Sequence, residues 1–358
     1  MITLTQLLSG WFQENRRVLP FRQTLDPYRI WVSEIIMQQT RINQGLPYYE
    51  RFVERFPDIR TLASADESEV MKMWQGLGYY SRARNMISAS HQILTDFAGK
   101  FPDNFPDLIT IKGIGRYTAA AIASICFKQP VPVVDGNVLR LIARLYGIRD
   151  SVQNPSGYRK VWEIAANIMD KENPGDFNQA MMEFGALVCK PQNPLCDDCV
   201  LRNHCVAFKE DLTEIIPLRD KKSGLKERYL NYLVISVTST YEKKYFMRLR
   251  KGADIWKNLY EFPLAETDQP LPPDELLNSE VWTEMFRENM VPPACLPREV
   301  VHKLTHRKLI IRFFVIELTQ PEIFVFHPGY QLYTLKEAFQ LAVPKPIEQY
   351  LKGLDTGL

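Results

Sequence analysis

The sequence predicts two domains, a helical domain followed by an α+β domain, joined by a charged linker. In residues 1–208, apolar side chains recur at spacings of three and four, the period of a helix that buries one face. From residue 229 the pattern changes to runs rich in Val, Ile, Phe and Tyr, as in β-strands. Residues 209–228 contain Pro217 and a dense group of charged side chains, so we expect a linker there and a second domain at 229–358.

Stop signals that contain Pro, Gly and Asp separate the expected helices of the first domain. These helices are Leu4–Phe12, Tyr28–Gln38, Glu67–Trp74, Ala83–Phe97, Tyr117–Phe127, Val138–Tyr146, Tyr158–Met169 and Asn178–Val188. The strands expected in the second domain are Tyr232–Thr238, Lys244–Leu249, Val300–Leu304, Leu309–Leu318 and Ile323–Phe326. Two short helices, Thr334–Leu341 and Pro346–Leu351, are expected to follow them.

Composition excludes some classes of protein before any motif is considered. The 358 residues are 46% hydrophobic and 24% charged, which is typical of globular domains with buried cores. The longest nearly apolar run, Ala119–Phe127, is far shorter than the roughly 20 residues of a membrane helix, so we expect no membrane partner. Met1–Gly10 lacks the pattern of a secretory signal, so we expect a cytoplasmic protein, associated with the nucleoid if bacterial. Because the formal net charge is only +2, any surface for nucleic acid must be a local patch.

Four of the six cysteines lie close together, in the pattern Cys189-x6-Cys196-x2-Cys199-x5-Cys205. A tight group in a large cytosolic chain indicates a metal or a cluster cofactor rather than a disulfide framework. Four thiolates can hold structural zinc or a [4Fe–4S] cluster. The spacing alone leaves both open, because only Cys196 and Cys199 form a CxxC pair and the run matches neither ferredoxin pattern.

A pair of glycines, Gly113 and Gly115, lies between two short expected helices. They let the backbone turn tightly and expose amide groups at the start of the second helix, whose positive dipole end suits a phosphate. The flanking charges in Lys112–Arg116 favour an anion further. An isolated GxG is equally compatible with a plain helix–helix turn. The longer string Leu108–Ala119 resembles the helix–hairpin–helix of DNA repair proteins and so favours DNA binding.

Several strings together resemble one family. The hairpin is followed by VVDGNV at 133–138 and then by the four-cysteine loop, as in the helix–hairpin–helix DNA glycosylase superfamily with its [4Fe–4S] loop. The strings WVSEIIMQQT at 31–40 and GLGYYSRAR at 76–84 are similar to those of the MutY-type adenine DNA glycosylases. The resemblance covers nearly the whole chain. It implies an all-α glycosylase domain at 1–208, with the [4Fe–4S] cluster held by Cys189, Cys196, Cys199 and Cys205, and a Nudix-like domain at 229–358.

The same resemblance implies the activity and its central residues. The substrate would be double-stranded DNA with adenine opposite 8-oxoguanine or guanine, and the enzyme would be a monomer. Glu34 would protonate adenine at N7, and its mostly apolar helix face would raise its pKa and keep it protonated near neutral pH. Asp135 matches the family's catalytic aspartate and would stabilise an oxocarbenium-like sugar, although a lone Asp before a helix is more often an N-cap. Asn137 would orient groups at the site.

Position 117 bears on strand cleavage. Glycosylases of the endonuclease III type carry a Schiff-base lysine there, whereas this chain has Tyr117, so the resemblance implies a monofunctional hydrolase that leaves an abasic site. Lys112 is close in sequence and leaves a weak lyase side activity open. Two other readings stay open as well. One is a bifunctional endonuclease III-like glycosylase, and the other is a non-catalytic DNA-binding or redox-sensing iron–sulfur protein.

A flipped adenine requires a pocket, a filler for the gap it leaves and a reader of the orphan base. The resemblance implies that the residues lining the adenine pocket are Arg17, Leu19, Phe21 and Gln179. Phe21 stands where the family usually has Trp, so we expect a smaller stacking surface. The residues implied to contact DNA beside the flipped base or in the hairpin are Gln39, Tyr79, Lys112, Gly113 and Gly115.

The C-terminal domain is implied to recognise 8-oxoguanine. Its glutamates lack the spacing of a Nudix magnesium site, so we expect no phosphohydrolase activity. The family uses a Phe-Ser-His loop, and the matching residues here are Leu304, Thr305 and His306. Thr305 keeps a hydroxyl and His306 is retained, so both are expected to contact the lesion, whereas Leu304 removes the Phe ring. A plain β-hairpin turn is the alternative.

Overall fold

The structure is a computed structural model that describes residues 3–152, 154–218, 224–239, 242–252, 254–272, 274–286, 297–304, 306–318 and 329–356. The chain forms two compact units. The first consists of Met1–Ser64 and Asn85–Lys222, and the second of Ala65–Arg84 and Ser223–Leu358. The segment Ala65–Arg84, with helix α5 (Glu67–Trp74), therefore packs with the C-terminal part of the chain.

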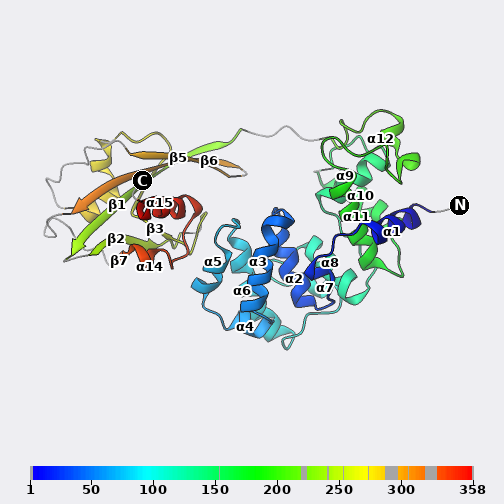
Figure 1. The fold of residues 1–358 in the computed structure, drawn as a ribbon, viewed down its shortest axis with the longest axis horizontal. Helices are drawn as coiled ribbons and strands as arrows, with labels where there is room; N and C mark the ends of the chain where they lie inside the picture. Colours follow the sequence, from blue (N-terminus) through cyan, green and yellow to red (C-terminus); the bar gives the residue numbers. More distant parts are fainter. Residues whose placement is uncertain are drawn as a thin grey trace. The chain divides into compact units, whose positions relative to one another are not determined.

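The described residues of the first unit form helices in two groups (Figure 1). One group contains α2 (Pro27–Met37), α3 (Ile42–Arg55), α4 (Ile59–Ala63), α6 (Ser81–Asp96), α7 (Phe105–Leu108) and α8 (Arg116–Phe127). The other contains α1 (Leu4–Asn15), α9 (Gly136–Leu145), α10 (Pro155–Asn167), α11 (Pro174–Leu187) and α12 (Val206–Lys209). Helix α11 contacts α1 and α9 in its own group and α8 in the other, so it joins the two groups. Throughout the described ranges, no helix has the length and apolar character needed to cross a membrane.

Local capping explains where the helices of the first unit begin. The Asp26 carboxylate accepts a hydrogen bond of 2.9 Å from the Tyr28 amide, and Pro27 occupies the first position of α2. Asn154 caps α10 in the same way, again with a proline at the next position. Short side chains that compete with the helix backbone thus fix the starts of helices, as the sequence pattern predicts.

Helices α3 and α4 lie outside the helices expected from the sequence. Helix α3 contains Gly45 and Pro47, two residues that usually mark helix ends. Tertiary packing explains the glycine, because a Cβ atom at Gly45 would lie 2.7 Å from Met37 Sδ of α2. A larger residue at Gly45 would therefore require the end of the Met37 side chain to move.

The second unit contains a mixed seven-stranded sheet in the order β3-β2-β1-β6-β5, with β4 beside β1 and β7 beside β2. Its strands are β1 (Lys226–Ser239), β2 (Glu242–Leu249), β3 (Tyr260–Glu261), β4 (Leu264–Thr267), β5 (Arg298–Lys303), β6 (Arg307–Leu318) and β7 (Gln331–Thr334). Strands β1 and β6 run parallel and the other pairs antiparallel. The predicted α+β class is confirmed. The strand expected at 323–326 lies outside the described residues.

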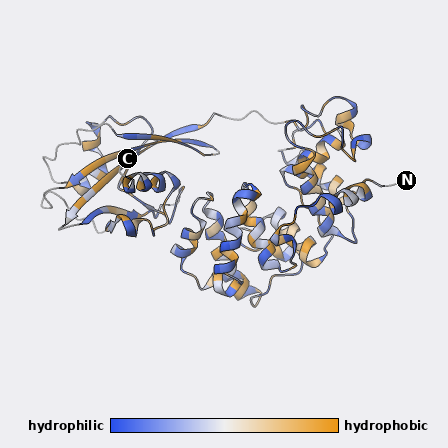
Figure 2. Ribbon diagram, in the orientation of Figure 1, coloured by the Kyte–Doolittle hydropathy of each residue, from blue (hydrophilic) through white to orange (hydrophobic). Residues whose placement is uncertain are grey.

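Helices cover both faces of this sheet. Two neighbouring residues of β6 show this, since neighbouring side chains of a strand point to opposite faces. On β6, the Phe313 ring stacks on Tyr350 of α15 (Lys345–Asp355), with centroids 4.1 Å apart. The next residue, Phe314, belongs to the core cluster of Trp282, in α13 (Glu280–Met285). The remaining helical elements are η3 (Glu275–Asn278) and α14 (Leu335–Ala338). Figure 2 shows the alternation of apolar and polar residues along the helices and strands.

The residues expected to form the hairpin lie between α7 and α8. Gly113 has φ of 77°, and a Cβ atom there would lie 2.6 Å from Asn85 Cβ. Gly115 is the N-cap of α8, has φ of −84°, and a Cβ atom there would meet no atom within 4 Å. The protein's own packing therefore explains Gly113 but not Gly115.

We expect Gly113→Ala to destabilise the protein by about 2 kcal/mol, because it combines left-handed backbone strain with a clash. Gly115→Ala should cost less than about 1 kcal/mol, the usual loss on changing an N-cap glycine to alanine. Urea unfolding of both variants measures the difference. Equal losses of unfolding free energy would contradict this account of the hairpin.

Candidate active site

A cleft of about 660 Å³ in the first unit lies where the two helix groups meet. Helices α2 and α8 contribute one side, and α9 and α11 the other. Seven of the residues expected at the active site line it: Arg17, Phe21, Glu34, Tyr117, Asp135, Asn137 and Gln179. Leu19 does not, because its side chain is 5% exposed and belongs to the core. The size of the cleft suits a small ligand such as a nucleobase.

Asp135 is a helix N-cap and also lies at the cleft. It is the N-cap of α9, and its Oδ1 accepts hydrogen bonds from the backbone amides of Asn137 (2.9 Å) and Val138 (2.8 Å). Its Oδ2 accepts a third from Asn137 Nδ2 at 2.7 Å. Burial raises the pKa of Asp135, and these three hydrogen bonds counteract that rise by favouring the ionised form. Capping therefore fixes a buried carboxylate at the edge of the cleft.

The loop before Asp135 is held by Asn178 of α11. Asn178 Nδ2 donates to Ser124 Oγ and to the Val131 carbonyl, both at 2.9 Å, and Asn178 Oδ1 accepts from the Val133 amide at 3.0 Å. The Asn178 side chain is 1% exposed, so these bonds form away from water. They connect α8, the loop and α11, and thereby fix the position from which Asp135 enters the cleft.

Glu34 lies in a different environment from Asp135. Burial raises the pKa of Glu34 to about 7, and the nearby Asp135 adds to the rise. A hydrogen bond with the Tyr117 side chain and the charge of Arg22 oppose it. The two carboxyl groups thus differ in what favours their ionised forms, since backbone amides stabilise only Asp135. Such a difference is typical of an acid and a carboxylate that act together.

Arg17 is bound to an acid that the sequence analysis did not identify. Arg17 Nε and Nη2 donate to Glu183 Oε1 at 2.7 Å and Oε2 at 2.5 Å. Arg22 donates to the same two oxygens at 3.0 and 2.8 Å. Glu183 is 1% exposed, and the two guanidinium groups lower its pKa to about 2. Gln179 and Glu183 are four residues apart on α11 and share one helix face. This spacing is the sequence signal that could have identified Glu183.

Arg140 of α9 links the active site to the cysteine loop. Its Nη2 donates to Asn137 Oδ1 at 2.9 Å and to the Gly185 carbonyl at 2.7 Å, and its Nε donates to the Cys189 carbonyl at 2.7 Å. One turn later, Arg144 donates to the Lys190 carbonyl at 2.6 Å. Two buried arginines therefore connect the N-terminus of the cysteine loop to the helix that Asp135 caps.

The four cysteines of the loop line one small cavity of about 30 Å³. Burial and the neighbouring thiols raise the pKa of Cys199 to about 11, so a bound cationic group is needed to hold it as a thiolate. Four soft sulfur donors around one cavity suit zinc or iron–sulfur chemistry. In the described ranges, no three His, Cys, Asp or Glu side chains are arranged to hold a metal ion, so the shared cavity is the structural indication.

The remaining expected contacts lie apart from the cleft. Gln39 follows α2 with φ of 57° and does not line the cleft, and Lys112 is exposed in the hairpin. Tyr79 is 47% exposed and lines a second cavity of about 580 Å³, in the second unit, together with His306. Thr305 lies outside the described residues. The same cavity is lined by Trp256, which the sequence analysis missed.

Comparisons with known proteins agree with these features. Three family models match consecutive parts of the chain: the HhH-GPD superfamily of base excision DNA repair proteins at 32–167, the iron–sulfur binding domain of endonuclease III at 189–205, and the NUDIX domain at 234–353. An adenine DNA glycosylase from Buchnera aphidicola subsp. Schizaphis graminum is 33% identical over 356 residues, which cover 97% of each chain. The chain belongs to the adenine DNA glycosylase family.

A second adenine DNA glycosylase supports the membership, and a solved structure supports the glycosylase fold. The adenine DNA glycosylase of Arabidopsis thaliana is 32% identical over 87% of this chain and 57% of its own length. A solved structure described as a thermostable thymine-DNA glycosylase is 26% identical, with a TM-score of 0.54, and covers 57% of this chain and 95% of its own. The chain is therefore a DNA glycosylase that combines a helical HhH-GPD domain, an iron–sulfur binding domain and a Nudix-like domain.

Because the pKa of Glu34 is near 7, base release by this glycosylase should depend on its proton. The single-turnover rate constant should fall about tenfold per pH unit above about pH 7, where Glu34 loses the proton. A raised folded-state pKa also lowers stability as pH rises from the unfolded value towards about 7. Glu34→Gln should therefore abolish base release and unfold at higher urea concentration than the wild type at about pH 8. A flat pH profile would contradict the assignment.

Arg140→Ala should lower the free energy of unfolding by about 3 kcal/mol, because it leaves buried oxygens of Asn137, Gly185 and Cys189 without a donor. We also expect base release to slow at least about tenfold, since Asn137 and Asp135 lose their support. Arg149→Ala is the matched control. Arg149 pairs with Glu210 on the surface, so its loss should cost less than about 1 kcal/mol. Equal effects of the two variants would exclude a special role for Arg140.

Proposed function

We propose that this glycosylase hydrolyses the N-glycosidic bond of adenine paired with 8-oxoguanine or guanine in double-stranded DNA and leaves an abasic site. The observation that carries the proposal is the meeting of Glu34, Tyr117 and Asp135 in one cleft, where burial raises the pKa of Glu34 to about 7 and three hydrogen bonds favour the ionised form of Asp135. This is the arrangement required to protonate a poor leaving group and to stabilise the cationic sugar left behind.

The roles of the cleft residues follow from their surroundings. Glu34 donates its proton to adenine N7, and the bond between N9 and C1′ then breaks as positive charge develops on the sugar. Asp135 is held by two backbone amides and Asn137, so its charge remains directed at one position while that cation forms. Water then adds to C1′ and transfers a proton to the ionised Glu34, which restores the acid. Tyr117 orients the Glu34 carboxyl group through their hydrogen bond.

The absence of a suitable amine supports hydrolysis over lyase chemistry. Among the described residues that line the cleft there is no lysine, and position 117 is tyrosine. Lys112 lies in the hairpin with its backbone amide bonded to Gln92 Oε1, and its side chain is not part of the cleft. A Schiff base at C1′ requires a neutral amine at the sugar, so the geometry favours a monofunctional enzyme.

The adenine base has a ready environment next to Glu34. The Arg17–Glu183–Arg22 cluster, Gln179 and Phe21 line the same cleft. The Phe21 ring meets Tyr49 edge to face at 5.4 Å between centroids, which holds its orientation. These residues offer fixed polar groups and an aromatic ring, the combination by which enzymes read flipped bases.

Two further surfaces support recognition of a mispair. Gly115 leaves open space at the N-terminus of α8, where a DNA phosphate can approach the free amides. In the second unit, Tyr79 and His306 line one cavity although they are far apart in sequence. We propose that this cavity reads the base opposite the flipped adenine, 8-oxoguanine in preference to guanine.

The iron–sulfur group is proposed to be a [4Fe–4S] cluster held by Cys189, Cys196, Cys199 and Cys205. When bound, it supplies cationic charge that keeps the four sulfurs deprotonated and the loop ordered. Arg140 and Arg144 transmit that order to α9 through the carbonyls of Cys189 and Lys190. An ordered cysteine loop would thus hold α9, the helix that Asp135 caps, in position.

A single-turnover assay tests the proposal directly. Duplexes with adenine opposite 8-oxoguanine, adenine opposite guanine, or an oxidised pyrimidine opposite guanine are incubated with the holoenzyme and quenched with or without hot alkali. We expect adenine release that produces strand breaks only after alkali, fastest opposite 8-oxoguanine. Asp135→Asn should abolish release by at least about 1,000-fold and retain mismatch binding.

Two results would contradict the proposal. Breaks without alkali at the oxidised pyrimidine would indicate the endonuclease III-type reaction. Tight binding without release from any duplex would indicate a non-catalytic protein.

A further inference from the structure

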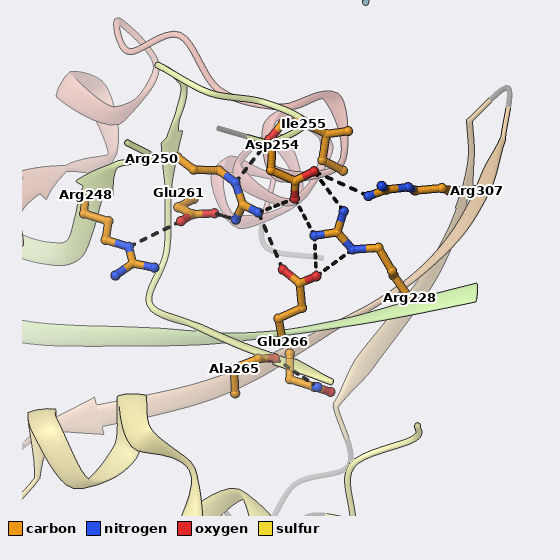
Figure 3. A network of polar contacts seen from close by, with 10 residues as sticks. Arg228, Arg248, Arg250, Asp254, Ile255, Glu261, Ala265, Glu266 and Arg307 are labelled. Atoms are coloured by element: carbon orange, nitrogen blue, oxygen red, sulfur yellow. Dashed lines mark hydrogen bonds and ion pairs between the residues drawn. The ribbon is translucent and has the colours of Figure 1, made fainter. Parts of the chain in front are cut away.

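A network of ion pairs in the second unit is centred on Asp254, in the loop between β2 and β3 (Figure 3). Arg228 Nη1 donates to Asp254 Oδ1 at 3.1 Å, and Arg250 Nη2 donates to Oδ2, also at 3.1 Å. Arg307 Nη1 lies 3.4 Å from Oδ1. Hydrogen bonds from Arg228, from the Ile255 backbone amide and from Arg250 hold the pKa of Asp254 well below its usual range, so it is ionised at neutral pH.

Two more acids complete the network. Glu261 is 1% exposed and pairs with Arg250 at 2.8 Å and with Arg248 at 3.3 Å. Glu266 pairs with Arg228 and, at 3.5 Å, with Arg250. Arg228 and Arg250 therefore each keep an acidic partner if the charge of Asp254 is removed. Arg307, in contrast, enters the network through Asp254.

The position of Arg307 gives this contact its significance. Arg307 is the first residue of β6 and directly follows His306 in the turn after β5. The Leu304 amide donates to the Arg307 carbonyl at 2.8 Å, which closes that turn. Asp254 thus connects two segments through Arg307. One is the turn that contains Leu304 and His306, and His306 was expected to contact 8-oxoguanine. The other is the loop between β2 and β3.

The loop that carries Asp254 is itself held in a strained conformation. Trp256 has φ of 62° and Asn258 has φ of 63°, backbone values that residues other than glycine rarely adopt. Such strain persists only where surrounding contacts enforce it, and it is common at functional sites. Here Arg250 Nε donates to the Ile255 carbonyl at 3.1 Å, and the Asn258 amide donates to the Arg250 carbonyl at 2.8 Å.

The loop that carries Asp254 and the turn that contains Leu304 and His306 form walls of the same cavity. Asp254, Trp256, Leu304, His306 and Arg307 all line it. The Trp256 indole is 8% exposed, and its centroid lies 6.1 Å from that of His302, the cavity residue that pairs with Leu309 across β5 and β6. Movement of the Asp254 loop or of the turn would change the shape of the cavity.

We propose that Asp254 is a positioning residue for lesion selection, which fixes the turn through Arg307 and the cavity wall through the loop that carries Trp256. The proposal rests on the proposed function, in which this cavity reads the base opposite adenine. Asp254 itself need not touch the DNA base. Its charge determines the spacing between two walls, and a fixed spacing is what allows a cavity to distinguish 8-oxoguanine from guanine, which differ by one oxygen at C8 and by the position of one hydrogen.

The test is Asp254→Asn, which keeps the shape of the side chain and removes its charge. In a Glu34→Gln background, which prevents base release, dissociation constants are measured by fluorescence anisotropy for duplexes with adenine opposite 8-oxoguanine and opposite guanine. We expect the preference for 8-oxoguanine to fall at least about fivefold, through weaker binding to that duplex alone.

Glu227→Gln is the matched control. It removes the surface pair between Glu227 and Lys308 at 2.8 Å, which joins the same two strands, β1 and β6, without touching the cavity. Its binding preference should equal that of the wild type. Arg307→Gln should reproduce the effect of Asp254→Asn, and the double variant should be no worse than either single one, because both remove the same contact.

The outcomes separate the two proposals. If the Glu34→Gln parent protein binds both duplexes equally, the proposed recognition of 8-oxoguanine is wrong, and this inference is wrong with it. A parent protein that prefers 8-oxoguanine, with an Asp254→Asn variant that keeps the full preference, would overturn only the role of Asp254. An equal loss on both duplexes would show that Asp254 supports the fold rather than selection. If Asp254→Asn melts well below the wild type, the Arg307→Gln variant decides by the same criteria.

Discussion

The active site depends on one electrostatic constraint, the placement of two carboxyl groups in one buried cleft with unequal support for their charges. Glu34 has burial and a nearby carboxylate to oppose ionisation, whereas Asp135 receives three hydrogen bonds. In water the two groups would ionise at nearly the same pH. Helix α9 creates the difference, because its first free amides point at Asp135 and none of them reaches Glu34. An ordinary helix cap thereby holds the carboxylate that we propose to be catalytic.

The rest of the first unit keeps that device in place. Asn178 fixes the loop that leads to Asp135, and Arg140 fixes Asn137 from the other side. Both are buried side chains whose hydrogen bonds end on backbone groups and on one other side chain each, so any shift would leave polar atoms without partners. The cysteine loop enters this arrangement through the Cys189 carbonyl. The iron–sulfur binding domain and the catalytic residues are thus parts of one hydrogen-bonded structure.

The second unit uses its acidic residues in another way. Glu261 and Glu266 are paired with arginines in the network that contains Asp254. Removing both arginine partners of the buried Glu261 would leave an uncompensated charge, which is costly away from water. Such a network specifies geometry, because each carboxylate accepts directed hydrogen bonds from more than one strand or loop. Glutamates that lack the spacing of a Nudix magnesium site in the sequence here pair with arginines next to a cavity.

The sequence by itself determined what depends on neighbours along the chain. Helix α5 has the predicted bounds, Asp26 and Asp135 cap the helices expected after them, and the spacing of the four cysteines located their loop. Only the tertiary structure decided which distant groups meet: Glu183 with Arg17, Arg140 with Cys189, and Asp254 with Arg307. These pairs leave no periodic signal, because the partners lie on different elements and the fold sets their distance. Helix periodicity and capping act over a few residues, whereas burial and charge pairing depend on the whole packed chain.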